Sequence, residues 1–541
     1  TLGGASTADN VFAPQISDNA SLATAVTKIG AGTWVLTNAN TYTGLTTIGT
    51  GTSAGGVLQA ADGTGLPTNS PLLLAAGTTG GGIFQTSGNF TRNIVATPSA
   101  GTGTVTLGAT TATTAAVGFS ASGGKLVVAL GGVGTETALT WGAGGFMGAT
   151  GTSTGAFVLN NALSTSEVEV RNAIDLNAAT RTIQVDDNGN TGADFATITG
   201  VISGSGSLTK SGTGILQLFG ANTYTGNTAV TAGTLTVTSL GNSTSAGATS
   251  VGDSTAGNST TGSLNLGNST TTAGVLEYVG PGETTDRMIR LNTTTATNQI
   301  HASGSGALIL TNVDNTMTNG VKTLALRGSS TAGNTISSVL TNANAGADAL
   351  SVLVDGGATW ILSGANTYTG NTTVSAGALG LGNDAALGTG SLVLSNGTVF
   401  AAGGDRTIAN AVTLSNNTTP AFAGDYSINF TGAFNNAAGA NNTAITNNIV
   451  AGETLTFGTM ANTGITAART LTINGSGDTI ITGGITTTTN FNLNLAYSGT
   501  GSLTLGGVSD INGGSMTFAS GTLKVGDNEA IPHGAAANTL T

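Results

Sequence analysis

Short runs in which apolar and polar residues alternate recur along the chain, and glycines separate one run from the next. In residues 33–36, a period of two places Trp34 and Leu36 on one side of a strand and Thr33 and Val35 on the other. Further stretches carry hydrophobic pairs in the same two slots, and we interpret all of these pairs as a core face: Trp34 and Leu36, Leu216 and Leu218, Trp360 and Leu362, Leu503 and Leu505. The pattern therefore predicts short β-strands with one buried side.

The first of these strands belongs to a stretch that returns nearly intact at residues 28–44, 210–226 and 354–370, and in degraded form at 498–525. Each intact copy ends in Asn-Thr-Tyr-Thr-Gly, whose residues mark the structural repeat: Asn40, Tyr42, Gly44, Asn222, Tyr224, Gly226, Asn366, Tyr368 and Gly370. We expect each tyrosine to pack at a corner with its hydroxyl in water. A stripe of tyrosines that stacks on sugars is the alternative.

A second strand follows each tyrosine, and a third strand follows a glycine turn, as at residues 229–231 and 234–237. Glycine suits such corners because it enters positive φ at no steric cost. Coils that wind one way explain the irregular loops better than hairpins do, because Asn-Gly pairs are too widely spread for a meander. The sequence predicts an all-β fold, a parallel β-helix or β-solenoid in the form of an elongated rod, with roughly 20–25 residues in each coil.

The repeats also predict the domain organisation. We expect one continuous β-solenoid over residues 1–541, with modules at about 28–200, 201–351 and 352–497 and a partial fourth module at 498–541. Each full module has an arginine-led strand after its tyrosine, at Arg92, Arg287 and Arg406, and Arg181 and Arg469 begin similar strands. The chain opens without an initiator methionine and stops within a strand-like run, so we expect a segment of a longer polypeptide.

Composition excludes several classes of function. Charged residues make up only 7% of the chain and 87 residues are glycine, so threonine, serine, asparagine and glycine must cover the surface. A net charge of −12 offers no basic footprint for nucleic acid or for an anionic bilayer. No apolar run is long enough to span a bilayer as a helix, and the absence of cysteine excludes disulfides and thiolate metal sites.

The pattern ANTYTGxTxVxAGxL, at residues 39–44, 221–235 and 365–379, resembles the autotransporter-associated β-strand repeat, also called the passenger-associated transport repeat. Lys28 and Lys210 are similar to the lysine that leads into this repeat, whereas Val354 and Asp355 depart from it. The resemblance implies a right-handed parallel β-helix on the outside of a Gram-negative-type bacterium. It also implies export through an outer-membrane barrel, with folding after translocation.

One loop has the oxygen-rich look of a calcium site. Asp186, Asn188, Asn190 and Asp194 could supply carboxylate and amide oxygens to Ca²⁺. No glutamate closes the loop as in an EF-hand, and Asp, Asn and Gly favour turns for local hydrogen-bonding reasons. We therefore favour a structural turn and expect no cofactor, with Ca²⁺ at this loop as the alternative.

Candidate catalytic groups are few. Glu167 and Glu169 lie about 7 Å apart on one strand face and could divide acid and base roles at a glycosidic bond, but a solvated face balanced by Arg171 explains them better. The densest charge cluster could resemble a polysaccharide-lyase groove, and surface ion pairing is the favoured interpretation of its members, Glu277, Glu283, Asp286, Arg287 and Arg290. The histidines, His301 and His533, are far apart, and we expect no catalytic residue.

These observations lead to one functional hypothesis with two alternatives. We expect a non-enzymatic extracellular β-solenoid that forms a cell-surface stalk, spacer or fibre unit of a Gram-negative-type bacterium. The alternatives are an autotransporter-type adhesin that binds glycans or neighbouring cells, and a secreted carbohydrate-active enzyme. The expected partners are like copies, end to end or side by side, and surface glycans, with no nucleic acid and no membrane-spanning segment.

Overall fold

A computed structural model describes the chain except for residues 7, 51–54, 76–80, 109–115, 149–154, 244–246, 254, 256–261, 269–270, 317, 437–438, 464–465, 488–490, 527–529 and 532–541. The described residues form β-strands and one short 3₁₀ turn, η1 (Asn344–Gly346). They divide into two compact units. Unit 1 comprises Thr1–Asn268, Thr272–Glu277 and Asp286–Ile289, and unit 2 comprises Ser269–Thr271, Tyr278–Thr285 and Arg290–Thr541.

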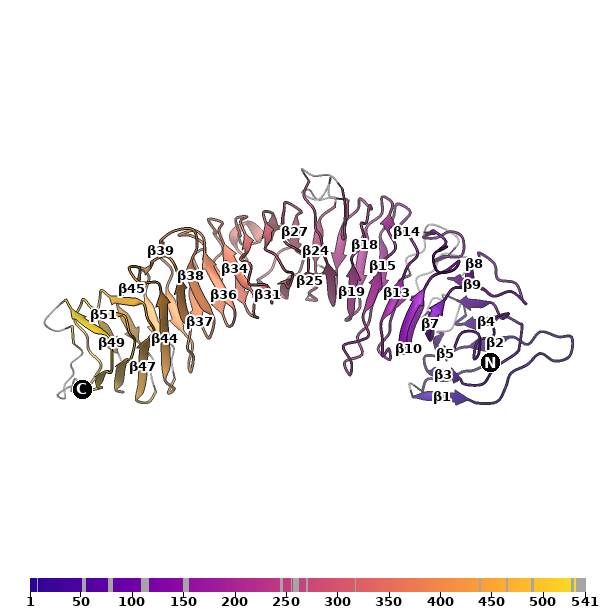
Figure 1. Cartoon of the computed structure of the whole chain (residues 1–541), viewed down its shortest axis with the longest axis horizontal. Coiled ribbons are helices and arrows are strands. Elements are labelled where there is room, and N and C mark those ends of the chain that lie inside the picture. The colour runs from indigo at the N-terminus through magenta and orange to yellow at the C-terminus, as the bar shows by residue number, and fades with distance from the viewer. Residues whose placement is uncertain are drawn as a thin grey trace. The chain divides into compact units, whose positions relative to one another are not determined.

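In unit 1, strands from successive coils pair in parallel along several ladders (Figure 1). The longest ladder runs through β1 (Asp9–Phe12), β3 (Thr33–Leu36), β5 (Gly56–Ala60), β7 (Gly82–Phe90), β10 (Val117–Val128), β13 (Val168–Val170), β16 (Ala196–Ile198), β19 (Ile215–Leu218) and β21 (Thr234–Val237). A second runs from β10 through β12 (Phe157–Leu159), β15 (Arg181–Gln184), β18 (Leu208–Ser211), β20 (Thr228–Val230) and β24 (Leu264–Leu266). Shorter ladders join β2 (Val26–Lys28), β4 (Thr46–Ile48), β6 (Leu72–Leu74), β9 (Thr104–Leu107) and β8 (Asn93–Ile94), and join β11 (Leu139–Thr140), β14 (Ile174–Asp175) and β17 (Ile202–Ser203).

Unit 2 repeats the arrangement, and three parallel ladders hold most of its described strands. The first contains β28 (Thr297–Ala302), β31 (Lys322–Gly328), β33 (Leu350–Val354), β35 (Thr372–Val374), β37 (Leu392–Leu394), β40 (Val412–Leu414), β43 (Phe434–Asn436), β46 (Met460–Asn462) and β49 (Ile485–Thr487). The second contains β26 (Glu283–Thr285), β29 (Leu308–Leu310), β32 (Asn334–Ile336), β34 (Thr359–Leu362), β36 (Ala378–Leu381), β38 (Thr398–Ala401), β41 (Ala421–Gly424), β44 (Thr443–Ile449), β47 (Arg469–Asn474), β50 (Leu493–Tyr497) and β52 (Met516–Phe518). The third contains β39 (Arg406–Ile408), β42 (Ile428–Phe430), β45 (Thr454–Phe457), β48 (Asp478–Ile481), β51 (Ser502–Leu505) and β53 (Thr522–Val525).

Every ladder named above is parallel, and a small hairpin of β22 (Ala248–Thr249) with β23 (Gly252–Asp253) is antiparallel. A residue therefore faces its counterpart one coil later, as Leu392 faces Val412 and Val412 faces Phe434. The predicted parallel β-helix is confirmed within each unit. The modules predicted from the repeats stay a prediction.

Aliphatic side chains on the inner side of the strands form the core of each unit. Alternation along the strands buries every second residue, and each such side chain contributes roughly 1.5–3 kcal/mol relative to an exposed position. Leu36 is 2% exposed, and six of the other expected core residues are each 0% exposed: Leu216, Leu218, Trp360, Leu362, Leu503 and Leu505. Trp34 is only half-buried, because β1, the strand that pairs with it, is itself exposed. Within the described residues, no helix has the length and apolar character to cross a membrane.

Candidate functional site: the repeated coil-bridging corner

The asparagine of each intact repeat joins three successive coils. Asn222 accepts the backbone N–H of Ile202 in the coil before it at 2.8 Å, and its Nδ2 donates to the carbonyl oxygen of Ser250 in the coil after it at 2.8 Å. Asn40 and Asn366 make the equivalent pairs of bonds, with Ile16 and Gly65 and with Leu340 and Ala386. All three side chains are buried, so each amide satisfies backbone groups that would otherwise be unpaired.

The tyrosine of each repeat is fully buried, and its hydroxyl is bonded to a threonine four residues later. The oxygen–oxygen distances are 2.8 Å for Tyr42 and Thr46, 2.6 Å for Tyr224 and Thr228, and 2.5 Å for Tyr368 and Thr372. The expectation of a wet hydroxyl is therefore wrong, because the threonine that opens the next strand turns its own hydroxyl inward. Burial raises the pKa of all three tyrosines, that of Tyr224 to about 12.

The glycine of each repeat lies against the backbone of the preceding coil. A Cβ atom at Gly44, Gly226 or Gly370 would lie 2.3 Å from a carbonyl oxygen, that of Thr24, Gly206 or Leu350 respectively. The amide of each glycine donates to that same oxygen. Only glycine permits this approach, and the hydrogen bond between coils depends on it.

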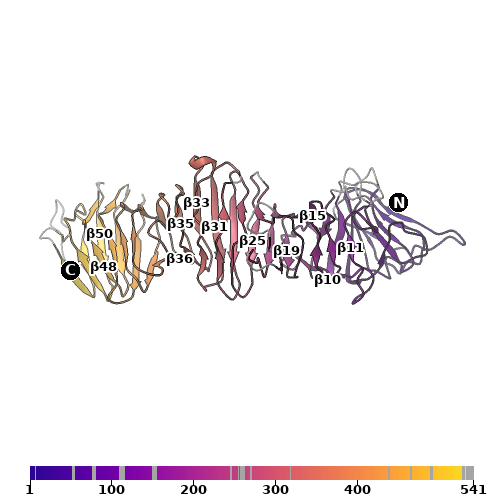
Figure 2. The same ribbon diagram turned by 90° about the horizontal axis from the view of Figure 1, so that it is seen from above.

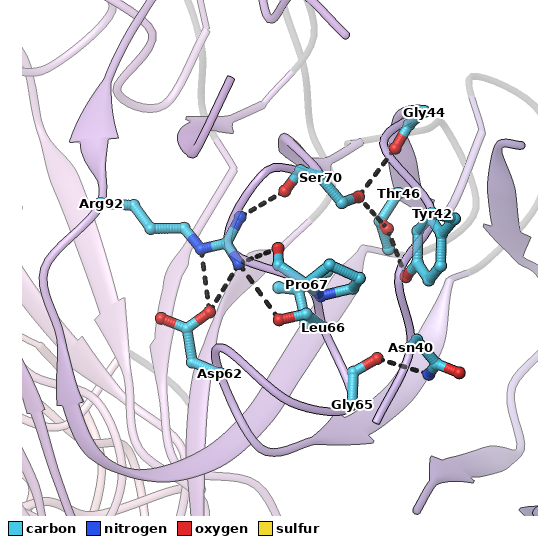
Figure 3. Close-up of polar contacts among 10 residues, drawn as sticks. All are labelled: Asn40, Tyr42, Gly44, Thr46, Asp62, Gly65, Leu66, Pro67, Ser70 and Arg92. Carbon is cyan, nitrogen blue, oxygen red and sulfur yellow. Dashed lines mark hydrogen bonds and ion pairs between the residues drawn. The ribbon is translucent and has the colours of Figure 1, made fainter. Parts of the chain in front are cut away.

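An arginine from a later coil closes the first corner (Figure 3). Arg92 donates to the carbonyl oxygens of Ser70 and Pro67 and forms an ion pair with Asp62 at 2.6 Å. The hydroxyl of Ser70 in turn bonds to the Gly44 carbonyl at 2.7 Å and to the Thr46 hydroxyl at 2.8 Å. Ser70 therefore connects the two groups, because its carbonyl oxygen accepts from Arg92 and its hydroxyl bonds to Thr46, the partner of the Tyr42 hydroxyl.

Arg287 lies against the second corner in a similar way, whereas the hydrogen bonds described for Arg406 reach no residue of the third repeat's Asn-Thr-Tyr-Thr-Gly motif. Arg287 donates to the carbonyl oxygens of Leu240 and Gly262, both at 2.6 Å, and Arg406 donates to that of Leu381 at 3.0 Å. Arg287 is 2% exposed, so surface ion pairing is the wrong interpretation for this residue. Arg290, in contrast, does form an ion pair, with Asp314 at 3.3 Å.

Two lysines that open the first two repeats are also buried. The Lys210 ammonium donates to the carbonyl oxygens of Ser211, Gly212 and, in the next coil, Ala232, at 2.8, 2.7 and 3.1 Å. Lys28 does the same with Ile29, Gly30 and Gly55. Burial lowers the pKa of Lys28 to about 8 and that of Lys210 to about 7. Sequence reasoning missed this role, although a lysine followed two residues later by glycine was the available signal.

The loop considered for calcium is a hydrogen-bonded turn. Asp194, which is 3% exposed, accepts the backbone N–H of Asn188 at 2.6 Å, and the Asn188 amide oxygen accepts from Asn190. Asp186 accepts from the side chain of Gln184 at 2.7 Å. Across the described part of the chain, no three His, Cys, Asp or Glu side chains lie together as metal ligands would.

The two glutamates on β13 and just before it form an ion-pair cluster with a lysine of β10. The Lys125 ammonium lies 3.1 Å from Glu167 and 2.8 Å from Glu169, and Arg171 lies 2.8 Å from the other oxygen of Glu169. His301 contacts the side chain of Gln299, and His533 lies outside the described residues.

The model of one family, passenger-associated-transport-repeat, matches residues 26–52, 208–237, 301–324 and 354–381. The chain carries passenger-associated-transport repeats. Three of the matched segments contain the corners described above. The segment at 301–324 was missed from the sequence, although Gly304, Gly306, Leu308 and Leu310 have the spacing of Gly212, Gly214, Leu216 and Leu218. It contains a third buried lysine, Lys322, which donates to the carbonyls of Asn315 and Thr318.

A curated protein is similar to part of the chain. The "Adhesin BmaC autotransporter" of Brucella suis biovar 1 (strain 1330) is 37% identical over 124 residues, which are 22% of this chain and 3% of the relative. The match thus spans a small part of the relative's length. No solved structure matches the chain. The repeats and this relative indicate a surface-exposed passenger of a Gram-negative bacterium.

Proposed function

We propose that this chain is a structural, non-enzymatic part of an extracellular autotransporter passenger, where it acts as a stalk, spacer or fibre unit. The observation that carries the proposal is the coil-bridging corner. Its asparagine and glycine, and the arginines of the first two corners, bind to neighbouring coils, as Asn222 does through both atoms of its amide, and its tyrosine is buried against a threonine four residues later. Side chains committed in this way stabilise a stack of coils and leave none of these groups for chemistry on a substrate.

The charged side chains support the same role. Lys125 and Arg171 form ion pairs with Glu167 and Glu169, which carried the enzymatic alternative, and Arg287 is buried. A glycosidase needs one carboxyl group that protonates the leaving group and one that attacks or activates water. Lys125 lies against both carboxylates and Arg171 also lies against Glu169, so both glutamates face cations and neither has the apolar surroundings that keep a general acid protonated.

Electron microscopy of the purified chain tests this proposal. We expect stiff particles of uniform width, which join end to end if the chain is a fibre unit and lie side by side if copies associate laterally. Flexible chains or compact spheres would contradict the role of a spacer. Turnover of a polysaccharide by the purified chain, lost in Glu169→Gln, would favour the enzymatic alternative.

Adhesion is the second candidate function, and the similarity to the Brucella adhesin favours it. In this case the chain binds glycans or neighbouring cells directly. Cells that display the chain should then attach to a host-cell layer or to one another. Equal attachment by cells that lack the chain would contradict adhesion and leave the structural role standing.

A further inference from the structure

We propose that a pocket beneath η1 in unit 2 binds a neutral saccharide through threonine hydroxyls. The inference rests on adhesion, the second candidate function, and names a site for it. The pocket has a volume of about 440 Å³. Its walls are Thr316, Thr341, Thr367 and Thr369, which come from three successive coils, and η1 with Asn342 closes one side.

Asn342 holds the wall of the pocket in place. Its Nδ2 donates to the Gly346 carbonyl at 3.0 Å and to the Thr369 hydroxyl at 2.9 Å, and its Oδ1 accepts the amides of Leu350 and Thr369, both at 3.0 Å. The side chain is 8% exposed. These four bonds tie η1 to the corner of the third intact repeat, so the pocket is formed before a ligand arrives and little ordering remains to oppose binding.

The turn η1, drawn as a coiled ribbon in Figure 2, contains two consecutive residues with a strained backbone. Asn344 and Ala345 both have φ of 50°, in the left-handed region, where a residue with a Cβ atom costs on the order of 1–2 kcal/mol. Asparagine tolerates this conformation, but alanine has no polar group that compensates for it. Strain of this kind persists at ligand clamps, and here it shapes the overhang above the threonines.

The free hydroxyls of the pocket define the ligand class. Thr316 donates its hydroxyl to Asp314 at 2.7 Å, whereas the hydroxyls of Thr341 and Thr367 make no hydrogen bond with any residue that the structure describes. The Thr369 hydroxyl accepts from Asn342 and keeps its own proton to donate. The described lining residues carry hydroxyl, amide and carbonyl groups and no charge. Such a wall matches the alternating donors and acceptors of a neutral sugar.

Binding by the whole chain to immobilised glycans tests the site. The probes are neutral oligosaccharides, sialylated oligosaccharides and, in separate spots, lipopolysaccharide, so that free glycans are distinguished from the saccharide of a cell surface. We expect neutral saccharides to bind. The variant carrying Thr341→Val and Thr367→Val, which loses two hydroxyls at nearly constant volume, should have an apparent Kd at least tenfold weaker.

The matched control is Thr413→Val on β40, a half-buried threonine of unit 2 that does not line the pocket. Its apparent Kd should equal that of the unchanged chain, and circular dichroism should be the same for all variants. Equal binding by all variants, a preference for sialylated glycans, or no glycan binding would each overturn the site. If cells that display the double variant still attach, the proposed site is wrong and adhesion remains a candidate function.

Discussion

Lysine and arginine side chains of both units lie inside the coils, where backbone carbonyl oxygens accept their hydrogen bonds. Lys210 binds three carbonyls and Arg287 binds at least two. A buried charge is costly unless it is paired or hydrogen-bonded. In this β-helix, backbone carbonyl oxygens at the corners of the coils accept those hydrogen bonds. Arg92 also has a carboxylate partner, Asp62.

At the residue scale, the buried tyrosines predict an unusual titration. Tyrosinate should be scarce at pH 10–11, because burial raises the pKa of five of the six tyrosines: Tyr42, Tyr224, Tyr278, Tyr368 and Tyr497. Tyr224 reaches a pKa of about 12, above the value of about 10 expected in the unfolded chain. Its contribution to stability is therefore complete below pH 10 and lost as pH rises through 12. Absorbance at 295 nm as a function of pH measures the ionisation of the tyrosines, and the chain unfolded in urea is the control.

A second residue-scale prediction concerns Gly226. The substitution Gly226→Ala places a Cβ atom 2.3 Å from the Gly206 carbonyl oxygen and should destabilise the coil by on the order of 1–3 kcal/mol, measured by the midpoint of urea unfolding. The matched control is Gly192→Ala, because a Cβ atom at Gly192 meets nothing within 4 Å. Equal midpoints for both variants would show that the corner backbone can move aside.

At the element scale, one short motif joins strands that are distant in sequence. Asn222 lies between β19 and β20, yet its partners are Ile202 and Ser250 in the coils on either side. Period-two alternation predicted the buried leucines of β19, because a strand's own geometry decides which residues share a face. The partners of Asn222 and Arg287 are not encoded locally, since they depend on which loops stack together.

The corner predicts a large effect from a small change. Asn222→Asp keeps the acceptor for the Ile202 amide but sets a carboxylate oxygen against the Ser250 carbonyl in a site that is 1% exposed. We expect the free energy of unfolding to fall by at least about 2 kcal/mol at pH 7, because the two oxygen atoms repel each other and the negative charge is buried. Asn429→Asp on the outer side of β42 is the control, and it should leave the unfolding midpoint nearly unchanged.

At the scale of the whole molecule, charge is divided between inside and outside. Seven of the 13 basic residues are buried. Among the described acidic residues, two are buried, Asp194 and Glu169. The accessible surface is therefore more acidic than the net charge of −12 indicates. The buried cations are Lys28, Arg92, Arg181, Lys210, Arg287, Lys322 and Arg469.

The stack of coils also predicts that damage stays local. In a linear array each coil contacts only its neighbours, so stability is close to a sum of unit and neighbour terms. Gly226→Ala should raise hydrogen exchange at β18 to β21 in unit 1 and leave β37, β40 and β43 in unit 2 protected as before. A uniform rise in exchange across both units would mean that the chain unfolds as one cooperative body.

The sequence alone determined the strands, their buried faces and the family of the repeat, because alternation and self-similarity are properties of neighbouring residues. Leu216 and Leu218 are buried for that reason. Only the tertiary structure decided which polar groups are inside. The Lys210 ammonium and the Arg287 guanidinium are inside because stacking brings backbone carbonyls of other coils to them, and the Tyr224 hydroxyl is inside because the stacked coils cover the corner where it meets Thr228. Which residues meet in this way depends on loops of irregular length, and alternation along one strand does not encode it.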